Sequence, residues 1–312
     1  MAGWPESLEA MLERVAAEFR IARITRPELL RSARQTGFVW TRQPGVVCLA
    51  ANRHYLSLAR ANPDVAVVVT SEEVARRDFE AATPCLIVCD RPDELYLWMH
   101  LHQQTPTGTA SPQIDPTATV DASAVLHGDV RIEADAWIGP RVVISGPAVL
   151  GRGVHVEAGA IIGCDGLYAK DVAGRRRHIP HYGGVAIGAD AFIHAGAVIV
   201  RSAIAGEATS IGPETHVGVM ANVGHDVQVG ARTTISSNVV IAGRARVGAD
   251  VWIGASATLS NAVSVGDRAK IRIGSVVVRD VAAGADVSSG NFAIDHAQAM
   301  RAYTREATRE KR

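Results

Sequence analysis

The sequence predicts a mainly β chain whose central part is a parallel β-helix, preceded by a small α/β domain and followed by a helical extension. Three observations predict this fold class. Aliphatic residues recur at every sixth position from Ile114 to Val277, with one interruption, and glycine often follows the aliphatic residue directly. Aromatic residues make up only 5% of the 312 residues, whereas 29 residues are glycine. This composition suits a core of small aliphatic side chains between tight, repeated turns.

Residues 1–105 lack the six-residue period. Apolar runs alternate there with helix-like segments: strands at 46–49, 65–69 and 85–89, and helices at 55–61 and 93–102. This alternation predicts a small α/β domain over residues 1–105. A linker rich in Thr, Pro and Gly follows at 103–113.

The β-helix is predicted over residues 106–283. An α-helix would scatter every sixth side chain around its axis, and a flat strand repeats every two residues. A period of six fits a short strand followed by a sharp corner, so that three units close a triangular coil of about 18 residues. The predicted inward positions are Ile114, Val120, Leu126, Ile132, Ile138, Ile144, Leu150, Val156 and Ile162, then Ile187, Ile193, Ile199, Ala205, Ile211, Val217, Val223, Val229, Ile235, Ile241, Val247, Ile253, Leu259, Val265, Ile271 and Val277. Residues 163–186 between the two series form a predicted loop insertion, whose basic middle at 175–177 either contacts phosphates or is simply solvated.

Composition and charge exclude several classes of protein. With 32 basic and 32 acidic residues the net charge is +0, which argues against nucleic-acid binding. No apolar run approaches the ~20 residues that span a bilayer, and the acidic N-terminus is unlike a signal peptide, so we expect a cytoplasmic protein. The four cysteines match no zinc motif, and we expect them to be small buried side chains. Residues 284–312 are predicted to form the helical extension, which is either solvated or docked to an acidic partner.

One histidine stands out by its place in the repeat. His225 lies just past an inward position, and Gly243 follows it by three repeat units, which is one full coil. A base beside a backbone N–H is a minimal set for acyl transfer, because the base takes a proton from the attacking group and the N–H holds the developing oxyanion. The alternative is an ordinary surface histidine. No metal site is predicted at the neighbouring pair formed by His225 and Asp226, since adjacent side chains diverge on a strand.

Several segments resemble the UDP-3-O-acylglucosamine N-acyltransferases of lipid A synthesis. The resemblance covers nearly the whole chain and rests on five motifs, which contain the candidate site residues: Leu49, Asn52 and Tyr55 in Leu49–Tyr55, Asp165 in Ile162–Gly166, His181 in His178–Gly183, Arg201 in Val200–Ser202, and His225 in Val223–Val227. It implies a left-handed β-helix, a uridine-binding N-terminal domain and a homotrimer. It also implies His225 as catalytic base, Gly243 as oxyanion donor and the other six residues as contacts of the nucleotide or substrate.

Three departures from the family pattern carry expectations of their own. Leu49 replaces one of the two rings that hold the uracil, so half of the aromatic clamp is expected to be missing. Gly218 stands where the family has an aspartate that orients the base, so His225 is expected to lack its carboxylate partner. The family's second active-site histidine is absent near 260–262.

The resemblance therefore implies transfer of an acyl group from a thioester to the amine of a nucleotide-linked amino sugar. The donor is acyl carrier protein or coenzyme A, with no tightly bound cofactor and no metal. One alternative is a short-chain, coenzyme A-dependent N-acyltransferase acting on dTDP- or UDP-amino sugars for surface polysaccharide. The other, from a different class, is a catalytically silent trimeric scaffold or binding protein.

Overall fold

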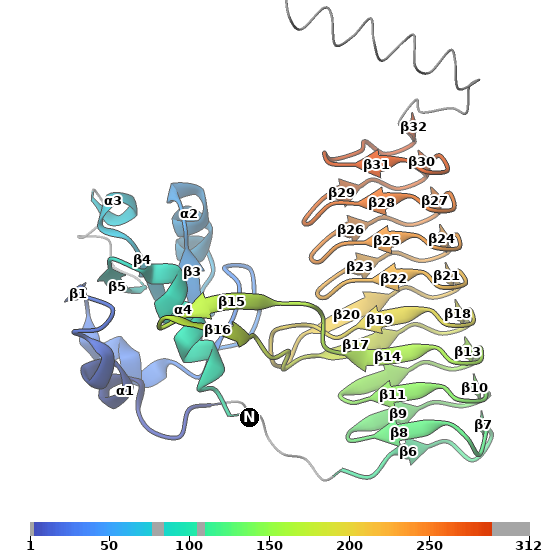
Figure 1. Ribbon diagram of the computed structural model, residues 1–312, viewed down its shortest axis with the longest axis horizontal. Coiled ribbons are helices and arrows are strands. Elements are labelled where there is room, and N and C mark those ends of the chain that lie inside the picture. Colours follow the sequence, from blue (N-terminus) through green and yellow to red (C-terminus); the bar gives the residue numbers. More distant parts are fainter. Residues whose placement is uncertain (1–2, 77–83, 105–109, 289–312) are drawn as a thin grey trace, which may run out of the picture.

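The computed structural model describes residues 3–76, 84–104 and 110–288, and its fold is mainly β, as predicted (Figure 1). A solenoid of stacked coils carries most of the strands, and a smaller sheet with helices lies beside it. Of the helical extension predicted over residues 284–312, residues 289–312 lie outside the described residues, whereas residues 284–288 belong to the solenoid and contain the strand β32 (Asp286–Val287). Within the described part of the chain, no helix is both long and apolar enough to cross a membrane.

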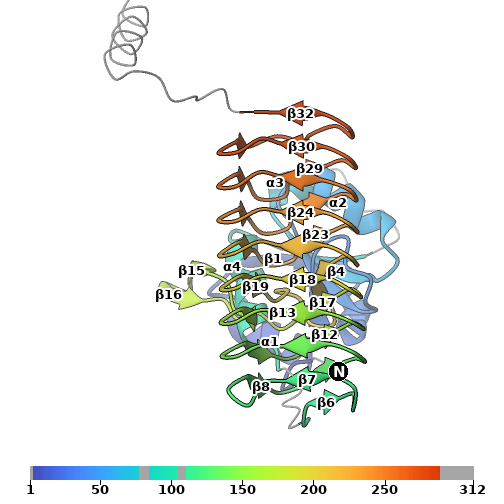
Figure 2. The same ribbon diagram turned by 90° about the vertical axis from the view of Figure 1, so that its right-hand side faces the viewer.

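The solenoid has three walls, each a parallel sheet to which every coil adds one short strand (Figure 2). The first wall comprises β7 (Thr119–Val120), β10 (Trp137–Ile138), β13 (His155–Val156), β18 (Phe192–Ile193), β21 (His216–Val217), β24 (Thr234–Ile235), β27 (Trp252–Ile253), β30 (Lys270–Ile271) and β32 (Asp286–Val287). The second comprises β8 (Val125–His127), β11 (Val143–Ser145), β14 (Ile161–Cys164), β19 (Val198–Val200), β22 (Asn222–Val223), β25 (Val240–Ile241), β28 (Thr258–Leu259) and β31 (Val276–Val277). The third comprises β6 (Gln113–Ile114), β9 (Val130–Ile132), β12 (Ala148–Leu150), β17 (Gly184–Ile187), β20 (Ala208–Ile211), β23 (Gln228–Val229), β26 (Arg246–Val247) and β29 (Ser264–Val265).

The inward positions form one continuous apolar core, as the period predicts. Val217 pairs with Ile235, one regular coil further on, and Ile235 is 1% exposed. In the first coil Val120 and Leu126 still pack against this core, but Ile114 is 45% exposed. This coil has a neighbour on one side only, so its side chains are covered on one side only.

Within the described residues, two insertions interrupt the regular coil, and the last coil is shorter, since Ile271 pairs with Val287. The predicted insertion leaves the solenoid after β14 and folds into an antiparallel hairpin of β15 (Ala169–Val172) and β16 (Arg175–His178) before β17 begins. A second interruption was not predicted: Ile193 pairs with Val217, which lies four repeat units further on instead of three, and residues 201–207 form a loop. Ala205, predicted to point into the core of the solenoid, lies in this loop, where its carbonyl accepts a hydrogen bond from Gln35 Nε2 (2.9 Å).

The N-terminal sheet has five strands in the order β1-β5-β4-β3-β2. Its elements are α1 (Leu8–Val15), β1 (Ile21–Ile24), the 3₁₀ helix η1 (Pro27–Ser32), β2 (Gln35–Thr36), β3 (Val46–Ala50), α2 (Arg53–Ala61), β4 (Val65–Thr70), α3 (Glu72–Ala75), β5 (Cys85–Cys89) and α4 (Pro92–Leu101). The three predicted strands and two predicted helices correspond to β3, β4, β5, α2 and α4. Helix α4 joins this part to the solenoid, because Tyr96 and Leu97 pack against Val172 and Ile179 of the insertion.

Candidate active site

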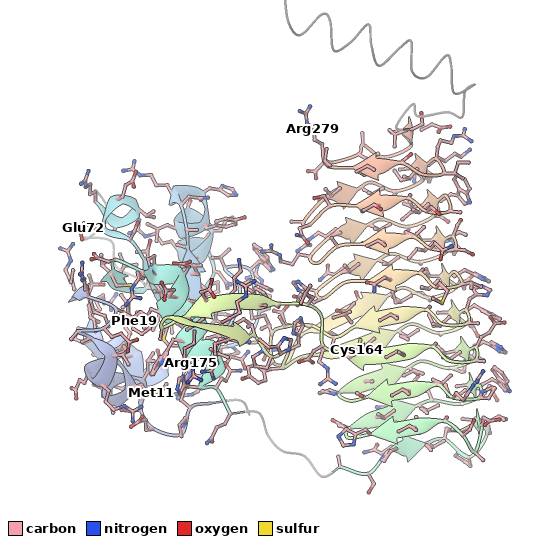
Figure 3. All side chains as sticks on the ribbon, viewed as in Figure 1. Met11, Phe19, Glu72, Cys164, Arg175 and Arg279 are labelled. Carbon is pink, nitrogen blue, oxygen red and sulfur yellow. The ribbon has the colours of Figure 1, made fainter. Side chains whose placement is uncertain are left out.

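The candidate site lies where the N-terminal sheet, the hairpin and the second wall of the solenoid meet. Side chains from all three fill the space between the two parts of the molecule (Figure 3). Two bridges hold this arrangement: the hairpin packs on α4, and Gln35 and Gln43 donate hydrogen bonds to carbonyls of the 201–207 loop.

His225 has a carboxylate partner, contrary to the expectation drawn from Gly218. Its Nδ1 lies 2.7 Å from Oδ2 of Asp226, the next residue in the chain. The expectation that adjacent side chains diverge fails because these residues follow β22 at a corner, where Asp226 has φ +61°. Aspartate tolerates this left-handed conformation better than most residues. The conformation turns the carboxylate towards the imidazole.

The Asp226 carboxylate is itself held by the 201–207 loop. Ser202 Oγ donates a hydrogen bond to Asp226 Oδ1 (2.5 Å), and the N–H of Ala203 donates to the same oxygen (3.2 Å). The N–H of Asp226 donates to Thr209 Oγ1 (2.9 Å). These donors fix the orientation of the carboxylate, which acts as an acceptor towards Nδ1 of His225 and leaves Nε2 facing away from it.

Gly243 lies directly against the His225 ring, as the spacing of one coil predicts. A Cβ built on Gly243 would lie 2.7 Å from His225 Cε1 and closer still to Nε2, and its three nearest atoms all belong to that ring. Within the described residues, the N–H of Gly243 donates no hydrogen bond. The free acceptor nitrogen of the imidazole and a free backbone donor therefore share one small space.

Two further rings surround His225. His181 meets it edge-on with ring centroids 5.3 Å apart, and Tyr168 stacks parallel to it at 6.1 Å. Burial lowers the pKa of His181 below the ordinary histidine value, and the neighbouring His225 lowers it further. Burial also raises the pKa of Tyr168. Both rings are therefore neutral near pH 7.

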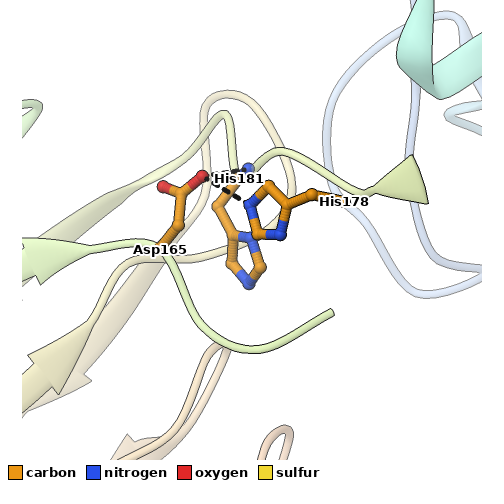
Figure 4. A group of neighbouring side chains, drawn as sticks. All are labelled: Asp165, His178 and His181. Atoms are coloured by element: carbon orange, nitrogen blue, oxygen red, sulfur yellow. Dashed lines mark hydrogen bonds and ion pairs between the residues drawn. The ribbon is translucent and has the colours of Figure 1, made fainter. Parts of the chain in front are cut away.

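Three predicted substrate residues, Asp165, His181 and Arg201, lie together, and Figure 4 shows the first two of them. Arg201 Nε donates to the carbonyl of Gly163 (2.5 Å) and lies 3.4 Å from Asp165 Oδ1. The N–H of His181 donates to Asp165 Oδ2 (3.3 Å). Of the three, His181 is in ring contact with His225. Asp165 contacts His181, and Arg201 contacts Asp165.

The structure brings together only two of the three residues predicted to bind the nucleotide. Leu49 and Tyr55 line a cavity of about 260 Å³ between α2, α4 and the hairpin. Asn52 does not line it: this exposed residue caps α2, and its Oδ1 accepts a hydrogen bond from the N–H of Tyr55 (3.0 Å).

The cavity contains more rings than the sequence predicts. Phe38 and Trp40 line it as well, stacked with centroids 5.2 Å apart, and Trp40 lies 6.4 Å from Tyr55. Trp40 thus places a second ring beside Tyr55, from a segment outside the compared motif. Two rings in such close succession, in a chain with 5% aromatics, were the signal that could have revealed them.

A second cavity of about 220 Å³ is lined by the same rings, Trp40 and Tyr55. Its lining also includes Asp226, the partner of His225, and Arg244. Arg244 lines both cavities, with its guanidinium 5.8 Å from the Phe38 ring, and Lys170 lines the aromatic one. Lys170 and Arg244 thus add two positive charges to the lining of the aromatic cavity.

Comparison with known proteins first defines the class. Residues 129–164 match the family model described as bacterial transferase hexapeptide (six repeats), and residues 244–279 match the hexapeptide repeat of succinyl-transferase. Two segments of the solenoid therefore match hexapeptide-repeat models.

The individual proteins that the chain resembles share less than a third of its residues. The chain is 29% identical over 236 residues to UDP-3-O-acylglucosamine N-acyltransferase of Bordetella pertussis, over 63% of this chain and 64% of that protein, just under two thirds of its length. The resemblance predicted from the sequence is confirmed, since the chain is similar to that enzyme at low identity. Among solved structures, UDP-N-acetylglucosamine O-acyltransferase from Moraxella catarrhalis is 23% identical over 61% of this chain and 77% of that chain, with a TM-score of 0.49. The Francisella novicida UDP-N-acetylglucosamine acyltransferase is 22% identical over 54% and 62% of the two chains, with a TM-score of 0.46.

Proposed function

We propose that this chain is an N-acyltransferase that moves an acyl group from a thioester to the amine of a nucleotide-linked amino sugar. The observation that carries the proposal is the 220 Å³ cavity, because its lining includes both the Trp40 and Tyr55 rings and the carboxylate that holds His225. Similarity to an N-acyltransferase of the same substrate class supports this reading.

The lining of the two cavities suits the three parts of such a substrate. A pyrimidine base stacks on Trp40 and Tyr55, since stacking on aromatic side chains is worth about 1–3 kcal/mol per base. Lys170 and Arg244 face the diphosphate as two positive charges. The sugar amine then lies beside His225 Nε2.

The transfer itself needs one base and one oxyanion donor. The amine nitrogen attacks the thioester carbonyl carbon while His225 Nε2 accepts the amine proton, and Asp226 stabilises the imidazolium that forms. The N–H of Gly243 donates a hydrogen bond to the oxyanion of the tetrahedral intermediate. The carbon–sulfur bond then breaks, and the imidazolium returns its proton to the departing thiolate. The amine proton thus ends on the thiol, and the electron pair of the carbon–sulfur bond leaves with the sulfur.

The acyl donor is either acyl carrier protein or coenzyme A. The resemblance also implies a homotrimer with active sites between neighbouring subunits, which size-exclusion chromatography with light scattering tests directly. A scaffold without activity remains the rival from another class.

The test combines activity with ligand binding. Purified protein is incubated with UDP- and dTDP-amino sugars bearing a free amine and with acyl carrier protein or coenzyme A thioesters of several lengths, and products are identified by mass spectrometry. We expect one acceptor to be acylated, and His225→Ala to lower the rate by about 10²–10⁴-fold. His127→Ala, an exposed histidine on β8, serves as the matched control. Calorimetry showing no binding of UDP or dTDP, together with no product, would reject the proposal in favour of the scaffold.

A further inference from the structure

Three potential metal ligands meet at the base of the hairpin (Figure 4). Asp165 directly follows β14, His178 ends β16, and His181 comes shortly after it. One ligand atom from each of these residues lies within 4.8 Å of the other two. Their spacing along the chain matches no metal motif, which is why the sequence predicts no metal here.

A second observation concerns His181 alone. The residue is only 4% exposed, yet neither of its ring nitrogens has a hydrogen-bond partner among the described residues. Buried polar side chains nearly always have a partner, so an orphaned one calls for an explanation such as a bound ion. Cys164, another potential ligand nearby, is not part of the cluster.

The geometry already resembles a coordination site. His178 Nε2 and Asp165 Oδ2 are 3.4 Å apart, and two ligands at about 2.1 Å from a tetrahedral zinc ion would be about 3.4 Å apart. The side chain of His178 is exposed, so it can turn to adjust the distance of its own ring nitrogen to the other two ligand atoms. Arg201 faces the other carboxylate oxygen, Oδ1, and leaves Oδ2 to the two histidines.

We propose that Asp165, His178 and His181 bind a divalent first-row transition metal ion, such as Zn²⁺, which closes the base of the β15–β16 hairpin. Two imidazoles and one carboxylate form a ligand set that suits such ions better than it suits calcium or magnesium. The ion joins the two ends of the 165–181 segment. It thereby holds Tyr168 and His181 in place against His225.

The first experiment measures binding of Zn²⁺ by calorimetry and of Co²⁺ by its visible absorption, on the full-length protein after treatment with a chelator. We expect one ion per chain, and His178→Ala should weaken binding by more than about tenfold, a loss typical even of residues that only support a ligand. His178 is exposed, so this variant should fold. The matched controls are His127→Ala and His194→Ala, the latter because His194 lies 3.3 Å from Glu157 in a separate cluster on the first wall.

The second experiment reads out the hairpin itself. Arg175, Arg176 and Arg177 on β16 are exposed and offer trypsin three adjacent cleavage sites. Zn²⁺ should slow cleavage there by several-fold in the wild-type protein and leave it unchanged in His178→Ala. Three results would overturn the proposal: no bound ion in the wild-type protein, equal affinity in His178→Ala, or loss of binding in His194→Ala instead.

Discussion

Replacing Gly243 by alanine is the most direct test of the geometry around His225. The φ of Gly243 lies outside the left-handed region, so alanine can adopt the same backbone conformation. The added methyl group would lie 2.7 Å from Cε1 and 2.8 Å from Cδ2 of His225, and its three nearest atoms all belong to the imidazole. The substitution therefore strains one contact, and that contact involves the base.

The size of the effect follows from these distances. Two carbon atoms in van der Waals contact are about 3.5–4.0 Å apart, so the ring must move by about 1 Å. The 2.7 Å contact between Nδ1 of His225 and the Asp226 carboxylate would then stretch beyond the normal hydrogen-bond range. Misplacing a catalytic group by about 1 Å costs about 10²-fold in rate, and overpacking costs about 1–3 kcal/mol of stability.

The assay is a double-mutant cycle of thermal or urea unfolding. We expect Gly243→Ala to destabilise the wild-type protein by about 1–3 kcal/mol but to have little effect in a His225→Ala background, where the ring is gone. In the wild-type background turnover should fall by about 10²-fold. An equal loss of stability in both backgrounds would refute the reasoning, because the methyl group would then be straining something other than His225.

Four further predictions concern other parts of the molecule. Asp226→Asn should leave thermal stability nearly unchanged but lower kcat by about 10²–10⁴-fold in steady-state assays, because the amide no longer fixes the tautomer of the base; unchanged kcat would contradict this. Trp40→Ala and Tyr55→Ala should each weaken UDP or dTDP binding in calorimetry by about ten-fold or more, and equal affinity would show that the nucleotide binds elsewhere. Ile235→Asp should lower stability by several kcal/mol (about 3 or more), since it buries a charge at a position 1% exposed, and a normal melting temperature would exclude the inward register. Burial lowers the pKa of His100 to about 4, below its unfolded value near 6.5. The free energy of unfolding, measured with urea, should therefore fall by about 3 kcal/mol as the pH is lowered from 6.5 to 4. This pH-dependent loss should be absent in His100→Gln.

The solenoid could be read from the sequence because one residue type at one spacing determines it. Each wall position such as Ile235 contacts the same kinds of neighbour above and below, so the local pattern carries the tertiary information. The N-terminal strands were readable as short apolar runs, but their order in the sheet was not. Strand order depends on contacts between distant segments, such as the pairing of β1 with β5, which no local pattern encodes.

The candidate site was readable only where it follows the repeat. His225 and Gly243 are one coil apart, so the period places them together. Trp40 lies far from both in the sequence, and its position depends on how α4 docks on the hairpin. Asp226 was misjudged because the rule for alternating side chains holds within a strand and fails at a corner with positive φ.

The 201–207 loop explains why the second interruption escaped detection. The coil that contains it comprises four repeat units instead of three, so the aliphatic register after the loop is the same as before it. A period count therefore assigns the extra unit to a wall and places Ala205 in the core. In the structure this unit lies outside the coil, where it is free to take contacts that a wall segment cannot make. Its Ser202 and Ala203 hold the carboxylate of Asp226, and its later residues bind the N-terminal sheet. Lengthening one coil by a whole number of units is thus a way to add a support for the pair formed by His225 and Asp226 without disturbing the coils that follow. A search for function in such solenoids should therefore examine coils that are longer by one unit.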